Sequence, residues 1–569
     1  MSEEKVSTNY RTLPELLSYR VKQNPDLPFI LFQDRTITYR EFDGATNRLA
    51  RGFKDLGVKK GQVVSIFSFN CPEYVMVWYA LNKIGAVMGP INIAFKGEET
   101  GYVMKNSEAV AVVASPVLAD VLESVAGDCP HLKHRIYLGD TPVDGSLVLN
   151  DLMEGKADAP LEGETVAPDD VASIIYTSGT TGHPKGVQLT HWNYICDTTA
   201  AAELMPLTTG EVIMMILPLF HVNAQVATVT APMVVGGTVA MLQMFNPAMF
   251  WEAVEQYRPV TFSGVPTILA ILMDAPGADT ADYSSLRYVI CGAAPLPVSL
   301  FHRFEDKFGL HILEGYGLTE GTCVSSLNPY YGVRKIGSIG LPLRGQQMVI
   351  MDEEGNILPP NSYGEICIKG PNVMKGYYKN PEATKETIRD GWLRTGDVGY
   401  MDEDGYFWIV DRIKEMIIRG GENIYPREIE EVLYRHEKVS ECAIIGHPSE
   451  KYGEVVKAVI VPKPDCEVTE EEIKEYCKEK IARYKVPSIV VFRDAIPKTQ
   501  TGKIAKKILK RQDMPMATVP RPGSMVPKTG AISDVAMPPW AMRLPNMVLR
   551  ANSSFTCIGL KSPVIPANR

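Results

Sequence analysis

The chain has 569 residues, of which 45% are hydrophobic and 22% are charged, and its acidic residues outnumber the basic ones to leave a formal net charge of −9 at pH 7. Such a length predicts about two to four domains, and the composition excludes wholesale disorder. The acidic balance makes nucleic acid a poor candidate partner, because phosphate backbones would be repelled.

The apolar runs of this chain are too short to cross a bilayer, which takes about 20 residues. The longest runs, 212–219 and 231–242, contain Pro or Gly and are expected to form buried strands and turns. The N-terminal segment MSEEKVSTNY is polar and unlike a secretory signal. Ten scattered cysteines without a CxxC pair predict reduced thiols rather than a disulfide framework or a zinc site. We therefore expect a cytoplasmic protein with no transmembrane segment.

Between residues 63 and 315, short runs rich in Val and Ile alternate with helix-length segments. Continuous apolar strands that alternate with helices are typical of parallel sheets covered on both faces, so the predicted class is α/β. The expected strands are 63–67, 109–114, 172–176, 212–217, 260–263, 288–290 and 312–314. The expected helices are 72–84, 117–126, 247–256 and 298–308.

The pattern changes after Gly337. Residues 346–411 hold short strands punctuated by Gly and Pro, which predict a distorted antiparallel barrel that completes a large N-terminal domain, residues 1–411. Residues 412–511 predict a small α+β C-terminal domain, with strands near 441–445 and 455–461 and helices near 427–435 and 470–482. The tail 512–569 is expected to be disordered, because it is rich in Pro and Met and has no sustained period.

The strongest chemical motif follows the expected strand 172–176 and reads Tyr176-Thr-Ser-Gly-Thr-Thr-Gly-His-Pro-Lys-Gly186. Its glycines allow the backbone to approach an anion closely, and its N–H groups and hydroxyls suit phosphate oxygens. It is not a Walker A loop, because Pro184 stands where the second glycine belongs. A polar turn without a ligand is the alternative interpretation. The residues expected to bind phosphate are Thr177, Ser178, Gly179, Thr180, Thr181, Gly182 and Lys185.

Five further segments accompany this loop along the chain. They are Tyr316-Gly-Leu-Thr-Glu320, Thr395-Gly-Asp397, Asp411-Arg412-Ile-Lys414, Arg419-Gly-Gly-Glu-Asn-Ile-Tyr-Pro426 and Pro497-Lys-Thr-Gln-Thr-Gly-Lys503. Together, and in this order, they resemble the adenylate-forming superfamily of acyl-CoA synthetases, nonribosomal adenylation domains and luciferases, over about residues 10–511. The run Phe220-His-Val-Asn-Ala-Gln225 is also similar to carnitine/crotonobetaine–CoA ligases.

This resemblance implies two half-reactions in one site. A carboxylic acid attacks the α-phosphate of ATP to give an acyl-adenylate and pyrophosphate, and a thiol then displaces AMP. Coenzyme A is the expected thiol, because no Gly-Gly-x-Ser carrier motif follows residue 511. The expected cofactors are therefore ATP, Mg²⁺ and coenzyme A as a co-substrate. The resemblance also implies that the C-terminal domain is mobile and turns about a hinge at 411–415, where Lys414 lies.

The resemblance assigns catalytic roles to Lys503, Thr319 and Glu320. Thr319 would donate to the α-phosphate, and Glu320 would ligate Mg²⁺ through a hard carboxylate oxygen. Lys503 and Mg²⁺ would offset the charge that builds on the phosphate oxygens during transfer. Because this lysine context resembles sites of lysine acylation, a lysine acyltransferase or deacylase acting on Lys503 is an expected partner.

The resemblance also implies a nucleotide site. Tyr316 would stack on the adenine, Asp397 would accept both ribose hydroxyls, and Arg412 would donate to the same sugar. The remaining residues expected in this site are Gly292, Ala293, Ala294, Glu314 and Gly315.

The acyl pocket is expected to be lined by Val265, with His221 at its mouth. Acetate-activating members of the superfamily have a bulky Trp where this chain has Gly317, so this pocket is expected to run deeper. No Arg or Lys in these segments could pair with a second carboxylate, which favours an apolar acid. A medium- or long-chain fatty acid is the first expectation, and an aryl or alicyclic acid or a carnitine-type acyl group stays open.

A different class of function also stays open, namely a non-catalytic nucleotide-binding protein or a luciferase-like relative. Release of pyrophosphate that depends on an added carboxylic acid would separate these from a ligase. The expected partners are small molecules, and a homodimer is compatible with the sequence.

Overall fold

The computed structural model describes residues 8–140, 143, 145–163, 165–177, 184–420, 422–449, 451–498 and 504–512. Local signals explain several helix starts. α2 (Tyr39–Asp55) begins at a capping box in which the side chains of Thr38 and Glu41 each accept from the other's backbone N–H. α3 (Pro72–Lys83) has Pro at its first position, where a backbone N–H would have no helical partner.

The first sheet is mainly parallel and contains, among the described residues, nine strands in the order β16-β15-β14-β13-β12-β10-β11-β1-β2. Six neighbouring strands pair in parallel, in the order β1, β11, β10, β12, β13 and β14. The strands β2, β15 and β16 pair antiparallel with their neighbours. Their bounds are β1 (Pro28–Phe32), β2 (Arg35–Thr38), β10 (Val212–Met215), β11 (Thr238–Met241), β12 (Thr261–Gly264), β13 (Tyr288–Cys291), β14 (His311–Tyr316), β15 (Ser326–Leu327) and β16 (Leu341–Pro342).

The second sheet has the order β19-β9-β8-β4-β3-β5-β6-β7 in the described part of the chain. β8, β4, β3, β5, β6 and β7 pair in parallel, and β9 forms an antiparallel hairpin with β8 that carries the glycine-rich loop. The bounds are β3 (Val63–Phe67), β4 (Val87–Pro90), β5 (Ala111–Ala114), β6 (His134–Tyr137), β7 (Leu147–Val148), β8 (Val171–Thr177), β9 (Lys185–Thr190) and β19 (Gly376–Tyr377).

Two further sheets follow along the chain. The third is a curled antiparallel sheet of β17 (Gln347–Met351), β18 (Gly364–Lys369), β20 (Ile388–Arg389), β21 (Trp392–Met401) and β22 (Phe407–Arg412). The fourth contains β23 (Ile417–Arg419), β24 (Glu422–Ile424), β25 (Val439–Ser449), β26 (Gly453–Pro462) and β27 (Ile489–Phe492), of which β26 and β27 pair in parallel.

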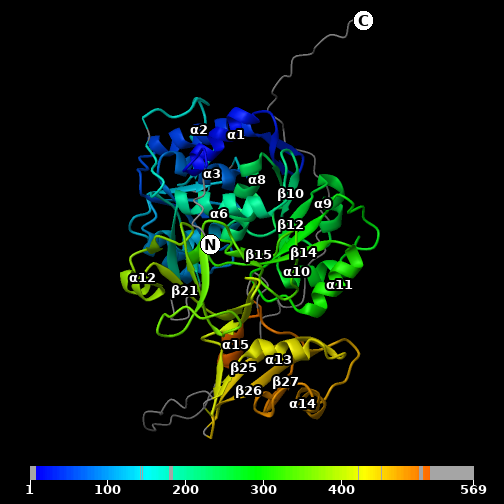
Figure 1. The fold of residues 1–569 in the computed structure, drawn as a ribbon. Helices are drawn as coiled ribbons and strands as arrows, with labels where there is room; N and C mark the ends of the chain where they lie inside the picture. Colours follow the sequence, from blue (N-terminus) through cyan, green and yellow to red (C-terminus); the bar gives the residue numbers. More distant parts are fainter. Residues whose placement is uncertain are drawn as a thin grey trace, which may run out of the picture. The chain divides into compact units, whose positions relative to one another are not determined.

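Helices pack against these sheets. α1, α2, α3, α6 and α8 contact one another, and their apolar side chains, among them Trp78 and Tyr194, join the main hydrophobic core (Figure 1). The remaining bounds are α1 (Leu13–Gln23), α4 (Gly97–Ser107), α5 (Ala119–Ala126), α6 (His191–Leu204), α7 (Val222–Gln225), α8 (Ala231–Val235), α9 (Phe250–Tyr257), α10 (Pro266–Met273), α11 (Val298–Phe308), α12 (Pro381–Thr387), α13 (Pro426–Leu433), α14 (Glu470–Lys478) and α15 (Lys506–Gln512), with short helical turns at Pro116–Leu118, Asn150–Leu152, Thr319–Gly321 and Arg483–Lys485.

The predicted class is confirmed: parallel α/β sheets, a distorted antiparallel sheet and a smaller α+β part. The expectation that 231–242 forms strands and turns is wrong for its first half, because α8 continues a π-helical segment, Val226–Thr230. An apolar run of this length is ambiguous between a buried strand and a buried helix. α14 ends at Lys478, earlier than predicted. Among the described helices, none combines the length and the apolar character that a bilayer span requires.

Candidate active site

Three neighbouring parallel strands of the first sheet bring predicted site residues to one edge. β12, β13 and β14 are adjacent, and their carboxyl ends lie at the same edge because the strands are parallel. Val265 follows β12, Gly292 to Ala294 follow β13, and Glu314 to Tyr316 end β14, with the turn Thr319–Gly321 shortly after. Ligands in open α/β sheets bind outside the carboxyl ends of such strands.

Small residues are required where β13 and β14 end. A Cβ added to Gly292 would lie 2.9 Å from the carbonyl oxygen of Gly315, and one added to Gly315 would lie 2.7 Å from Leu327 Cδ1. Ala293 has φ 67°, in the left-handed region that residues other than glycine rarely adopt. The glycines at 292 and 315 therefore let the backbone segments at this edge pack closely against their neighbours.

Asp397 gathers two of the predicted nucleotide residues around one carboxylate. The Tyr316 hydroxyl donates to Asp397 Oδ2 at 2.6 Å, and Arg412 Nε lies 2.9 Å from Asp397 Oδ1. Burial and the Asp397 charge raise the pKa of Tyr316 well above its usual value, so its hydroxyl stays a donor. The carboxylate of Asp397 in turn raises the pKa of Arg412, and the charge of Glu320 adds to this rise. Tyr316, Asp397 and Arg412, which are spread over 97 positions of the chain, thus lie together in one site.

Tyr377, which the motifs did not single out, links the glycine-rich hairpin to Glu320. Its hydroxyl donates to Glu320 Oε1 at 2.9 Å, and Lys185 Nζ lies 4.8 Å from the centre of its ring. Strand β19 places Tyr377 opposite Val187 of β9. Only the pair Tyr377-Tyr378 after a glycine marks this segment in the sequence, and that pattern alone does not indicate a site.

Glu314 is buried, and its carboxylate is close to a cation from another segment. Burial raises the pKa of Glu314 to about 7, while Arg427 of α13 lowers it. Its Oε2 has no hydrogen-bond partner within the described residues. An unpaired buried carboxyl oxygen is costly, so this position either stays protonated or meets a ligand group.

The residues predicted for the acyl pocket lie on two loops that follow β10 and β12, and the surroundings of Gly317 differ from those expected. Val265 is buried between β12 and α10, and His221 precedes α7 with its ring 4.5 Å from that of Phe220. A Cβ added to Gly317 would lie only 1.5 Å from the carbonyl oxygen of Cys323. The Cβ direction of Gly317 therefore faces backbone rather than open space, so it gives no support to a deeper pocket at this position.

Other predicted residues lie elsewhere or beyond the described chain. Lys414 is exposed in the turn that joins β22 to β23, and hence the third sheet to the fourth. Thr177 pairs with Lys185 at the base of the hairpin. The predicted residues outside the described residues are Ser178, Gly179, Thr180, Thr181, Gly182 and Lys503.

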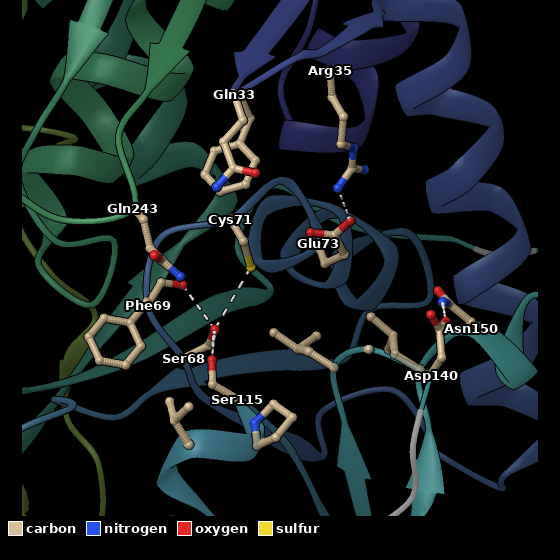
Figure 2. Close-up of a pocket in the computed structure, with 16 residues that line it drawn as sticks. Gln33, Arg35, Ser68, Phe69, Cys71, Glu73, Ser115, Asp140, Asn150 and Gln243 are labelled. Atoms are coloured by element: carbon tan, nitrogen blue, oxygen red, sulfur yellow. Dashed lines mark hydrogen bonds and ion pairs between the residues drawn. The ribbon is translucent and has the colours of Figure 1, made fainter. Parts of the chain in front are cut away.

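A cavity of about 500 Å³ lies apart from these residues and is shown in Figure 2. Ser68 follows β3 and Ser115 follows β5, and their hydroxyls lie 2.7 Å apart on its wall. Arg35 pairs with Glu73 at 2.8 Å on another wall. No residue predicted for the site lines this cavity in the described part of the chain.

Comparison with protein families identifies two matches. The model described as AMP-binding enzyme matches residues 17–378, and the model described as AMP-binding enzyme C-terminal domain matches residues 428–503. The chain belongs to the AMP-binding enzyme family. This places it in the adenylate-forming superfamily, as the motifs predicted.

Relatives of this AMP-binding enzyme are ligases. It is 37% identical over 494 residues to a feruloyl-CoA synthase of Amycolatopsis sp, covering 87% of this chain and 97% of the relative. It is 34% identical over 530 residues to a long-chain-fatty-acid–CoA ligase of Bacillus subtilis, covering 88% and 95%.

Among solved structures, an anthranilate CoA ligase in complex with anthranoyl-AMP superposes with a TM-score of 0.84 at 27% identity, covering 90% of this chain and 99% of that one. The AMP-binding enzyme is an AMP-forming acid–thiol ligase.

Proposed function

We propose that this enzyme joins an apolar monocarboxylic acid, in the first place a medium- or long-chain fatty acid, to coenzyme A through an acyl-adenylate. The observation that carries the nucleotide half of this proposal is the carboxylate of Asp397, which both Tyr316 and Arg412 contact. A buried carboxylate held by two donors is suited to accept hydrogen bonds from ribose hydroxyls, and the Tyr316 ring beside it offers a face for the adenine.

Glu320 is the proposed Mg²⁺ ligand. Mg²⁺ is commonly bound through one or two carboxylates together with substrate phosphates and waters. The residues fit this requirement. The Tyr377 hydroxyl orients the Glu320 carboxylate, and Lys185, which would face the phosphates, lies over the ring of the same Tyr377. When bound, the ion would neutralise charge on the phosphates.

The acid specificity is inferred from the composition of the two loops that hold His221 and Val265. Segments 217–225 and 265–267 contain no Asp, Glu, Lys or Arg, so they offer a cation no carboxylate and offer a second carboxylate no permanent cation, with His221 as the one titratable side chain. A cationic acid would bury an unpaired charge there, and a dicarboxylic acid would depend on protonated His221. An aromatic acid is the second candidate, because the feruloyl-CoA synthase and the anthranilate CoA ligase are similar to this chain.

We further propose that Lys414 marks the hinge between an N-terminal domain, 1–411, and a mobile C-terminal domain, 412–511. One site must present Lys503 to the phosphates and then admit the thiol, and rotation about a short connection would achieve both. The position of Lys414 in the turn between β22 and β23 supports this assignment.

The test is a panel of acids from acetate to palmitate, with ferulate, anthranilate, carnitine and oxalate. ATP–pyrophosphate exchange would report adenylation, and thioester formation would report the second half-reaction. We expect the highest kcat/KM with long apolar acids, and loss of about 10²–10³ in exchange for Lys503→Ala. Exchange without any added acid, or no exchange with any acid, would contradict the ligase proposal; a preference for carnitine or oxalate would contradict the apolar pocket.

A further inference from the structure

The backbone N–H of Leu219, two residues before His221, is held by Asn70. Leu219 N–H donates to Asn70 Oδ1 at 2.8 Å, while Asn70 Nδ2 donates to the carbonyl oxygens of Leu217 at 3.0 Å and Leu242 at 3.1 Å. Asn70 lies in the loop after β3 of the second sheet, whereas Leu217 and Leu242 follow β10 and β11 of the first. One buried amide thus joins loops at the carboxyl ends of both sheets.

The backbone carbonyl of Leu219, in the next peptide group, is held by Gln225. Gln225 Nε2 donates to the carbonyl oxygen of Leu219 at 2.8 Å, and its Oε1 accepts from the Tyr194 hydroxyl at 2.6 Å. The Tyr194 hydroxyl also lies 2.8 Å from Ser173 Oγ on β8, the strand that leads to the glycine-rich hairpin. The N–H and the carbonyl of Leu219 are therefore both bound by buried side-chain amides.

Burial makes this arrangement demanding. Asn70 is 3% exposed, and Gln225, Tyr194 and Ser173 are fully buried. A buried amide that loses its partners keeps its desolvation cost, so such a network admits few alternative positions of the loop. The neighbours of Asn70, Phe69 and Cys71, line the cavity of Figure 2, whereas the Asn70 side chain binds the Leu219 loop.

We propose that Asn70 and Gln225 are positioning residues that hold the backbone N–H and carbonyl of Leu219 and thereby set where His221 lies at the acyl pocket. This inference rests on the proposed function, because it takes the His221 loop as part of the acid site. It predicts that the network controls affinity and selectivity for the acid and leaves ATP binding unchanged, since neither residue contacts Asp397, Tyr316 or Arg412 among the interactions of the described residues.

The chain offers matched controls. Asn82 is as deeply buried as Asn70, and its Nδ2 donates to the carbonyl of Ala172 at 3.0 Å rather than to the Leu219 loop. Tyr79 is fully buried and its hydroxyl contacts Met233 Sδ, which makes Tyr79→Phe the control for Tyr194→Phe. Each control changes a buried polar group that does not bind the backbone of Leu219.

The experiment compares Asn70→Ser, Gln225→Met and Tyr194→Phe with Asn82→Ser and Tyr79→Phe in the full chain. Hydrogen exchange of a peptide covering 217–222 would report the loop without any assay of activity, and initial rates would give KM for the acid and for ATP. We expect faster exchange at 217–222 and an acid KM raised about tenfold for Asn70→Ser, with ATP KM unchanged and the preference between long and short acids altered. Tyr194→Phe is the milder variant and should show the same direction if Asn70→Ser fails to fold.

The inference is overturned if the Asn70 and Gln225 variants behave like their controls, with lower stability but unchanged acid KM, selectivity and exchange at 217–222. It is also overturned if exchange rises while acid KM does not, because the loop would then not position the acid. A wild-type enzyme that adenylates none of the acids would instead contradict the proposed function, which this comparison keeps separate.

Discussion

The hydroxyl of Tyr377 donates to Glu320 Oε1 across 57 positions of the chain, and the ring of the same Tyr377 lies under Lys185 Nζ. The tyrosine therefore couples a carboxylate of the first sheet to the base of the hairpin in the second. Glu320 is the proposed Mg²⁺ ligand, so the hydroxyl would fix the orientation of that ligand.

Replacing Tyr377 by Phe keeps the ring beside Lys185 and removes the hydroxyl, and with it the hydrogen bond to Glu320 and an interaction with Thr387. We expect the Mg²⁺ concentration for half-maximal adenylation to rise about tenfold, because loss of an outer-shell partner weakens metal binding to that extent. Titrating Mg²⁺ in the exchange assay would measure this. The neighbouring Tyr378, whose hydroxyl lies 3.5 Å from Glu108 Oε2, supplies the control Tyr378→Phe. Equal effects of the two variants would argue against a special role for Tyr377.

Gly317→Ala should destabilise the protein rather than change its preference for acid length. The added Cβ would lie 1.5 Å from the Cys323 carbonyl oxygen, so the backbone that carries Thr319 and Glu320 must move. We expect a lower midpoint of thermal unfolding, by several degrees, and weaker adenylation with every acid. Gly127→Ala, where a Cβ would meet nothing within 4 Å, is the control. A shift of chain-length preference at unchanged stability would restore the idea that this position opens into the pocket.

The buried carboxyl of Glu314 should make stability depend on pH. Its pKa is raised from 4.5 to about 7, so the folded state binds more protons than the unfolded state between these values. The stabilisation is fully present below pH 4.5 and is lost as pH rises through 7, by at most about 3 kcal/mol.

Glu314→Gln should therefore reduce the fall in the unfolding midpoint between about pH 5 and pH 8. The fall should persist in part, because burial also raises the pKa of Asp411 to about 6. The exposed Glu353→Gln serves as the reference. Parallel pH profiles for the wild type and the Glu314 variant would show that Glu314 does not titrate in this range.

Lys414→Pro should impair the thioester step more than adenylation. Proline holds φ near −65°, which would restrict the turn between β22 and β23. Ile413, Glu415 and Met416 donate backbone hydrogen bonds in or near this turn, and proline at 414 leaves these three N–H groups in place. Exchange and thioester formation from preformed adenylate would be compared with those of Lys414→Ala. Equal losses in both half-reactions would count against a hinge at this residue.

Local patterns in the amino-acid sequence were enough to predict the α/β class and most strands, because buried parallel strands are continuous runs of apolar residues. They were also enough to identify the family, since the glycine-rich loop and the segments around Glu320, Asp397 and Arg412 each carry residue types suited to binding phosphate, metal or ribose. Where one pattern fits two structures, as in the apolar run 231–242, the local signal was insufficient.

Contacts between distant segments required the folded chain. The sequence pointed to a deep pocket at Gly317, but the carbonyl of Cys323, six residues away, occupies the position of a Cβ at Gly317. It did not indicate that Tyr377 reaches Glu320, or that Asn70 and Gln225 bind the backbone N–H and carbonyl of Leu219. Such contacts depend on which strands become neighbours and on their register, and these follow from packing of the whole sheet rather than from any short stretch of residues.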